Sequence, residues 1–180
     1  GHNASEAMYY TGNLQVQGAN SYSSAITVKT NQNDSGGPAI VLGKSRGSLG
    51  GTTVLQNGDE LGTIYFAGAD GTDTNSYGAG IRCQLDGTPG SNDMPGRLTF
   101  LTTADGAASS TERMRITSTG RVLIGTTIDS NNPGGFYNKL QVEGTSADSS
   151  SISITRNSND NNPPYVNFGK SRGTSVNSNT

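Results

Sequence analysis

The hydrophobic positions of this chain come in short runs that are closed by turn residues. The runs are rich in Val, Ile, Leu, Phe and Thr, and Gly, Asn, Asp and Ser dominate the segments between them. Short runs of this kind are typical of β-strands, and the intervening residues are typical of turns. The pattern predicts strands at 13–17, 25–30, 39–44, 61–68, 80–85, 97–103, 113–117, 121–126, 139–143, 151–156 and 165–170.

Alternation of apolar and polar positions supports the strand assignment in the second half of the chain. Met114 and Ile116 flank Arg115, so both would lie on one face of a strand. The segment 105–118 has one alternative, a short helix capped by Ser110. The alternation favours the strand, and the strands and turns together predict an all-β fold.

Two motifs occur twice, at one common offset. Leu-Gln-Val-x-Gly stands at 14–18 and 140–144, and Gly-Lys-Ser-Arg-Gly stands at 43–47 and 169–173. Both pairs lie 126 residues apart, and the gap-free alignment that contains them has 16 identities in 34 positions. A period of this length indicates a multi-stranded module and not a solenoid repeat.

The repeat defines the expected domain organisation. Residues 1–12 are interpreted as a tag remnant and lead-in, because the start Gly-His-Asn is typical of a tag-cleavage scar. Residues 13–138 form one complete module, and 139–180 form a truncated second copy. The second copy ends soon after its Gly-Lys-Ser-Arg-Gly motif, so we expect the natural protein to continue.

Composition indicates a chain that needs neighbours in order to fold. Only 31 of the 180 residues are Leu, Ile, Val or Phe, and the formal net charge is −2. Such a chain buries little apolar surface alone, and identical copies can supply the missing burial. The 12 basic residues form no cluster, which argues against a nucleic-acid partner. No run approaches the roughly 20 apolar residues that would insert in a membrane.

Candidate chemistry is sparse. His2 is the only histidine and Cys83 the only cysteine, which argues against a nucleophile with a histidine base and against a disulfide scaffold. A calcium loop at 70–75 lacks EF-hand spacing. A glycosidase needs only two carboxylates, but acids beside Gly and Asn usually serve turns. These acids are Asp59, Glu60, Asp70, Asp73, Asp86, Asp93 and Asp105. The sequence therefore predicts a protein that is not an enzyme and has no cofactor or metal.

A series of motifs between about 43 and 144 resembles a known family. The series includes Gly43-Lys44-Ser45-Arg46-Gly47, Gly58-Asp59-Glu60-Leu61-Gly62, Asp86-Gly87-Thr88-Pro89-Gly90, Asn92-Asp93-Met94-Pro95-Gly96, Thr111-Glu112-Arg113-Met114-Arg115 and Gly120-Arg121-Val122-Leu123-Ile124. In this order it resembles the repeat modules of tail-fibre proteins from tailed phages, especially those of marine and cyanobacterial hosts. In many such proteins the modules precede an intramolecular chaperone domain of the endosialidase type.

The resemblance implies an elongated, intertwined homotrimeric fibre in the virion tail that supports attachment to the host cell. The expected partners are two further copies of the chain and a host surface glycan or protein. Two alternatives stay open: a segment of a polysaccharide-degrading tailspike, and a bacterial surface adhesin or injection-system fibre.

The Lys-Ser-Arg-Gly element gives the candidate site. It recurs after a strand-like run in each copy, and recurrence favours a structural role over a receptor site. The candidate structural joint consists of Lys44, Arg46, Gly47, Lys170, Arg172 and Gly173. Because guanidinium suits bidentate contacts at interfaces, we expect each arginine to meet a carboxylate or carbonyl of an adjacent chain.

Overall fold

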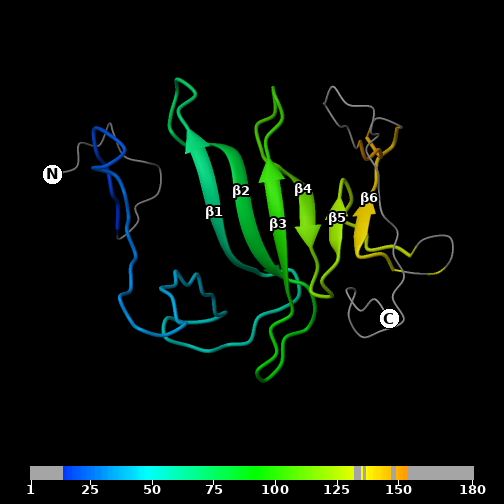
Figure 1. Ribbon diagram of the computed structural model, residues 1–180, viewed down its shortest axis with the longest axis horizontal. Helices are drawn as coiled ribbons and strands as arrows, with labels where there is room; N and C mark the ends of the chain where they lie inside the picture. The colour runs from blue at the N-terminus through cyan, green and yellow to red at the C-terminus, as the bar shows by residue number, and fades with distance from the viewer. Residues whose placement is uncertain (1–13, 132–134, 136, 147–148, 154–180) are drawn as a thin grey trace, which may run out of the picture.

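A computed structural model describes residues 14–131, 135, 137–146 and 149–153 of the chain. These residues form one six-stranded sheet with the strands in sequence order (Figure 1). The strands are β1 (Glu60–Gly68), β2 (Ser76–Leu85), β3 (Gly96–Thr102), β4 (Thr111–Ile116), β5 (Val122–Ile124) and β6 (Leu140–Val142). The described residues contain no helix, and therefore none that would cross a bilayer. The chain is all-β, as its sequence predicts.

Six of the predicted strands are present with shifted ends. The largest shift is in β2, which begins at Ser76 where the sequence predicts 80. The helical alternative at 105–118 is not formed, because β4 occupies Thr111–Ile116. The β4–β5 turn places Gly120 at φ 72°, the left-handed conformation that its position predicts.

Three strands predicted ahead of β1 are not formed. The stretches 14–17, 25–30 and 39–44 have no strand structure and are almost wholly exposed. A strand needs a neighbour to receive its backbone hydrogen bonds, and no described strand of the single chain pairs with these stretches, although Leu42 lies against Gly62 of β1. In Figure 1 this lead-in segment, residues 14–59, runs as a coil beside and below the sheet. The stretch 151–153 is also not a strand, and 154–156 and 165–170 lie outside the described residues.

β6 joins the sheet by parallel pairing with β5, whereas all other neighbours are antiparallel. The Val122 N–H donates to the Lys139 carbonyl at 2.7 Å, and the Glu143 N–H donates to the Ile124 carbonyl at 3.0 Å. β6 lies in the stretch 139–180 that the sequence predicts as a second copy, so the sixth strand of the sheet comes from beyond the predicted boundary at 138.

The strand register gathers apolar side chains on one face of the sheet. Residues directly opposite one another in adjacent strands point to the same face. One row of such partners runs across all six strands as Ile64, Ile81, Phe100, Met114, Ile124 and Val142. A second row runs from β2 to β6 as Cys83, Leu98, Ile116, Val122 and Leu140. We call these two rows, with Phe66, the apolar face.

The opposite face is largely covered by its own side chains. Arg82, Thr99, Arg115 and Leu123 form one row of partners there. Thr99 and Leu123 have no exposed surface, and Arg115 lies between them in this row. Tyr65 stacks on Tyr77 with ring centroids 4.2 Å apart on the same side.

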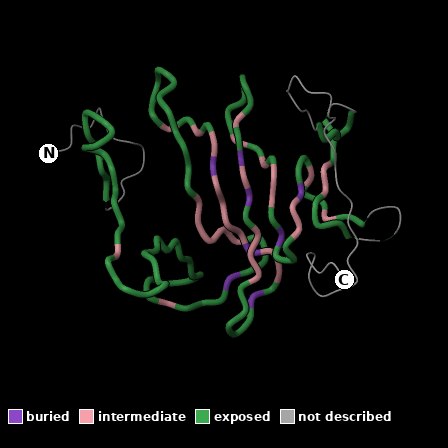
Figure 2. The backbone as a smooth tube through the Cα atoms, viewed as in Figure 1, coloured by how far each residue is buried: buried purple, intermediate pink, exposed green. Residues whose placement is uncertain are grey.

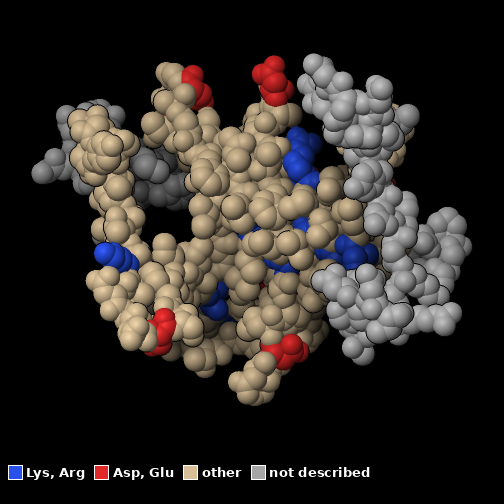
Figure 3. All heavy atoms as spheres, viewed as in Figure 1, with Lys and Arg blue, Asp and Glu red and all other residues tan. Residues whose placement is uncertain are grey.

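The apolar face has no comparable cover among the described residues. Ile64 is 53% exposed, Phe66 58% and Leu140 52%. The fully buried apolar side chains of the described residues are few and scattered, as the tube coloured by burial shows (Figure 2). Acidic side chains gather at loop tips at the two ends of the sheet (Figure 3). A stable β-domain buries its apolar face against a second layer, and the described single chain does not provide one.

Candidate functional site

The predicted joint lies within the lead-in segment, directly before the start of β1. Arg46 makes a bidentate pair with Asp59, with Nε 2.6 Å from Oδ2 and Nη2 2.7 Å from Oδ1. Lys44 Nζ lies 3.7 Å from Asp59 Oδ1. The partner of Arg46 is therefore a carboxylate of the same chain. The sequence predicts a carboxylate or carbonyl of an adjacent chain instead. We call Lys44, Arg46, Gly47 and Asp59 the Arg46–Asp59 joint.

The backbone around the joint forms a tight turn. The Arg46 N–H donates to the Thr53 carbonyl at 3.2 Å, which brings the two ends of the turn together. Gly47 has φ 88°, and a Cβ at this position would lie 2.8 Å from Thr53 Oγ1. Both the conformation and the close approach require glycine here.

Asp59 links the joint to the end of β2. Its carbonyl accepts from the Leu85 N–H at 2.8 Å, and its carboxylate accepts from the Gln56 N–H at 2.9 Å. The Arg46 guanidinium and the Gln56 N–H hold the pKa of Asp59 well below its usual value. The Asp59 side chain is only 10% exposed, whereas that of Arg46 is 42% exposed, so the pair lies at the surface with its arginine open to water.

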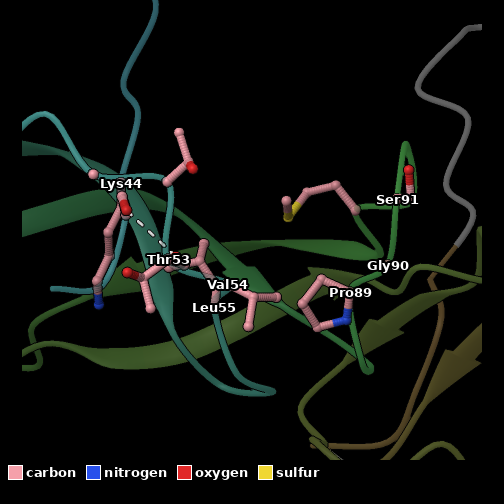
Figure 4. A pocket seen from close by; sticks show the side chains of 11 residues that line it. Lys44, Thr53, Val54, Leu55, Pro89, Gly90 and Ser91 are labelled. Carbon is pink, nitrogen blue, oxygen red and sulfur yellow. Dashed lines mark hydrogen bonds between the residues drawn. The ribbon is translucent and has the colours of Figure 1, made fainter.

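A shallow pocket of about 520 Å³ lies next to the joint. Lys44, Thr53, Val54 and Leu55 of the lead-in segment line one side, and the β2–β3 loop lines the other with Pro89, Gly90, Ser91 and Met94 (Figure 4). Leu55 and Pro89 are buried, so the pocket floor is apolar. Lys44 is its only charged lining residue, and the lining holds no acid, histidine or cysteine. The pocket thus has no pair of groups for acid–base or nucleophilic chemistry.

Of the other candidate acids, Glu60, Asp70, Asp73 and Asp86 make turn-forming hydrogen bonds or ion pairs. The Asp70 carboxylate accepts from the Thr72 and Asp73 N–H groups and from the Ser76 hydroxyl, and these bonds lower its pKa to about 2. Burial raises the pKa of Asp86, but bonds from Ser118 and Arg97 outweigh it and leave the pKa below its usual value. No group of three or more His, Cys, Asp or Glu side chains suited to a metal ion occurs in the described ranges.

The structure covers half of the predicted site residues. Lys44, Arg46 and Gly47 lie together at the joint, while Lys170, Arg172 and Gly173 lie outside the described residues. Sequence reasoning missed Asp59 as the partner of Arg46 and treated it as a possible catalytic acid. Thirteen residues separate the pair, and no spacing rule links residues across an irregular turn.

We expect Arg46→Ala to lower the melting temperature by roughly 2–5 °C, because it removes a bidentate pair and leaves the largely covered Asp59 carboxylate without its main partner. Circular dichroism melts would measure the change. Lys44→Ala is the matched control and should change the melting temperature by less than about 1 °C, since its contact with the same carboxylate is longer, at 3.7 Å, and is not bidentate. Normal stability of Arg46→Ala with lost binding to host cells would make the segment a receptor site instead.

Acid should weaken the fold through the same carboxylates. A group whose folded pKa is lowered stabilises the fold above its unfolded pKa of about 3.9, and this contribution is lost as pH falls toward the folded pKa. Asp59 and Asp70 are both of this kind. We expect the melting temperature to fall between about pH 5 and pH 2, and the fall to be smaller in Asp59→Asn than in the wild type. Asp105→Asn is the control, because Asp105 lies at a loop tip. If Asp59→Asn and Asp105→Asn altered the acid-induced fall in melting temperature equally, the role of Asp59 would be contradicted.

Comparison with known proteins bears on the fold. No protein-family model and no curated protein sequence matches the chain. A structure of the carboxy-terminal domain of the bacteriophage T5 L-shaped tail fibre with its intramolecular chaperone domain aligns with a TM-score of 0.50 and 19% identity, over 81% of this chain and 36% of that one. A second structure of that domain aligns with a TM-score of 0.47 and 14% identity, over 62% and 40%. The chain thus spans well under half the length of these tail-fibre domains, and its fold is like that of the first of them.

Proposed function

We propose that this chain is a structural, non-catalytic segment of a phage-type tail fibre, and that it works as a homotrimer. The observation that carries the proposal is the apolar face, which extends across all six strands and remains largely uncovered. The tail-fibre-like fold and the motif series between 43 and 144 support the same assignment. The motif series also favours the modules of marine and cyanobacterial phages over other tail fibres.

Assembly gives the apolar face the second layer that the single chain lacks. Three sheets arranged about a threefold axis would each turn this face toward the axis and bury it against the other two. Burial of apolar surface contributes roughly 25 cal/mol for each Å² removed from water, so covering the face would stabilise all three chains together. The opposite face, with its arginines and ion pairs, would then point outward.

The fibre would support attachment of the virion to a host cell through a surface glycan or protein. The joint and the turn-forming acids are occupied by structural contacts, which supports a mechanical role for this segment. If the segment instead degraded polysaccharide, incubation with host capsule would release reducing ends over time, and we expect no such release.

The reaction rate of the Cys83 thiol shows directly whether the apolar face is covered. Cys83 is half-buried in the single chain and lies in one row with Leu98 and Ile116. In the trimer we expect its thiol to react at least about tenfold more slowly with a thiol reagent than in denaturant, because reaction needs an accessible thiolate. Equal rates in the two conditions would show that this face stays open and would overturn the proposal.

A further inference from the structure

The stretch Leu14–Val16 has the sequence of β6 but not its position in a sheet. Residues 14–18 read Leu-Gln-Val-Gln-Gly and residues 140–144 read Leu-Gln-Val-Glu-Gly, so a single side chain distinguishes them. β6 pairs with β5, whereas 14–16 is not a strand. Leu14 is 77% exposed and Val16 is 42% exposed. One copy of the motif therefore lies in the sheet, and the other copy is not part of the sheet that the described residues form.

The two copies also fold into the same turn after the motif. The Asn20 carbonyl accepts from the hydroxyls of Ser23 and Ser24, each at 3.0 Å. At the equivalent place the Ser146 carbonyl accepts from Ser149 and Ser150 at 3.1 and 2.8 Å. A Cβ at Gly18 would overlap Ser23, and a Cβ at Gly144 would overlap Ser149, so the two glycines allow the same close approach. The local structure is thus repeated along with the sequence, although only one copy lies in the sheet.

The edge of β5 is shaped for this motif. Gly125 has φ 77°, and a Cβ there would overlap the Glu143 carbonyl oxygen, so glycine lets the incoming strand approach closely. Gln141 Nε2 donates to the Ile128 carbonyl at 3.0 Å, which fixes the register of β6 on β5. Leu140 and Val142 extend the two rows of the apolar face. The side chains that make these contacts, Leu, Gln and Val, are all kept at 14–16, and the contact at Gly125 involves only the backbone of position 143.

We propose that Leu14–Val16 is the sixth strand of another module of this kind, where it pairs in parallel with the strand equivalent to β5. Each module would then receive its last strand from the repeat that follows it, as the sheet described here receives β6. Neighbouring modules would share a sheet instead of being joined by a free linker. This sharing of a strand between neighbouring modules goes beyond the proposed structural role. It does not depend on the number of chains in the fibre.

A peptide of residues 13–24 tests the inference on a full-length chain whose β5 edge has been freed. Gln141→Pro removes a backbone donor from the middle of β6 without touching the apolar face. We expect the labelled peptide to bind this variant saturably and at least about tenfold more tightly than the same peptide carrying Gln15→Pro. Hydrogen exchange should show new protection at Val122–Ile124. Equal binding of the two peptides, or protection at the open edge of β1 instead, would overturn the inference.

The wild-type chain provides a second measurement if Gln141→Pro loses protection throughout β2 and β3. Excess peptide should then displace β6 and speed exchange of the Glu143 amide, while the Gln15→Pro peptide should not. In parallel, Glu143→Gln makes 140–144 identical to 14–18 and should keep β6 in place. Unchanged exchange with excess peptide, or loss of β6 in Glu143→Gln, would contradict the proposed pairing.

Discussion

Replacing Ile64 by Asp is expected to abolish assembly of the trimer and to leave a monomer. Ile64 is 53% exposed in the single chain, so in a folded monomer the change would cost little. In the proposed trimer it would place three carboxylates within one apolar interface, where a buried charge without a partner is strongly disfavoured. Size-exclusion chromatography with light scattering would show the loss of the trimer at micromolar concentration.

Ala67→Asp is the matched control for this change. Ala67 lies in the same strand and is exposed, but it pairs with Tyr77 and so points to the opposite face. It introduces the same charge, and we expect assembly to survive it. If both variants assembled normally, the apolar face would not be the interface between chains.

Gly125→Ala is expected to release β6 and to lower stability by about 2–5 kcal/mol, the sum of roughly 1–2 for a left-handed backbone and about 1–3 for the steric overlap. The overlap arises because a Cβ at this position would meet the Glu143 carbonyl. A loss of that size corresponds to a fall in melting temperature of roughly 5–15 °C. Exchange of the Glu143 amide, which donates to Ile124, would show whether β6 has detached.

Gly106→Ala separates the two parts of this effect. Gly106 has φ 75°, close to the value at Gly125, but a Cβ there would meet nothing within 4 Å. We expect it to cost only the backbone contribution of about 1–2 kcal/mol and to leave β6 in place. Equal effects of the two substitutions would mean that the close contact between β5 and β6 does not hold the sheet edge together.

The strands of the sheet were predictable because each carries its own signal. Alternation around Arg115 and the turn residues before and after it locate β4 without knowledge of any other strand. The same kind of signal at 25–30 and 39–44 predicts strands that the single chain does not form. Alternation reports a preference for extended structure, but a strand also needs a neighbour, and the sequence does not say whether that neighbour lies in the same chain.

The apolar face was not predictable, because it depends on register across several strands. Shifts in pairing occur between Phe66 and Ala67 and between Phe100 and Leu101, and each shift decides which side chains share a face. Of the Arg46–Asp59 pair, only the arginine was predictable from the sequence. The repeat drew attention to Arg46, but its partner Asp59 follows an irregular turn and looks locally like any acid beside a glycine.

The mass of the assembly in solution tests the central claim most directly. Light scattering at micromolar concentration should give about three times the 18.5 kDa mass of the chain, together with slow thiol chemistry at Cys83. A stable species of 18.5 kDa that unfolds cooperatively would contradict the account, because its apolar face would then be open to water in a folded monomer.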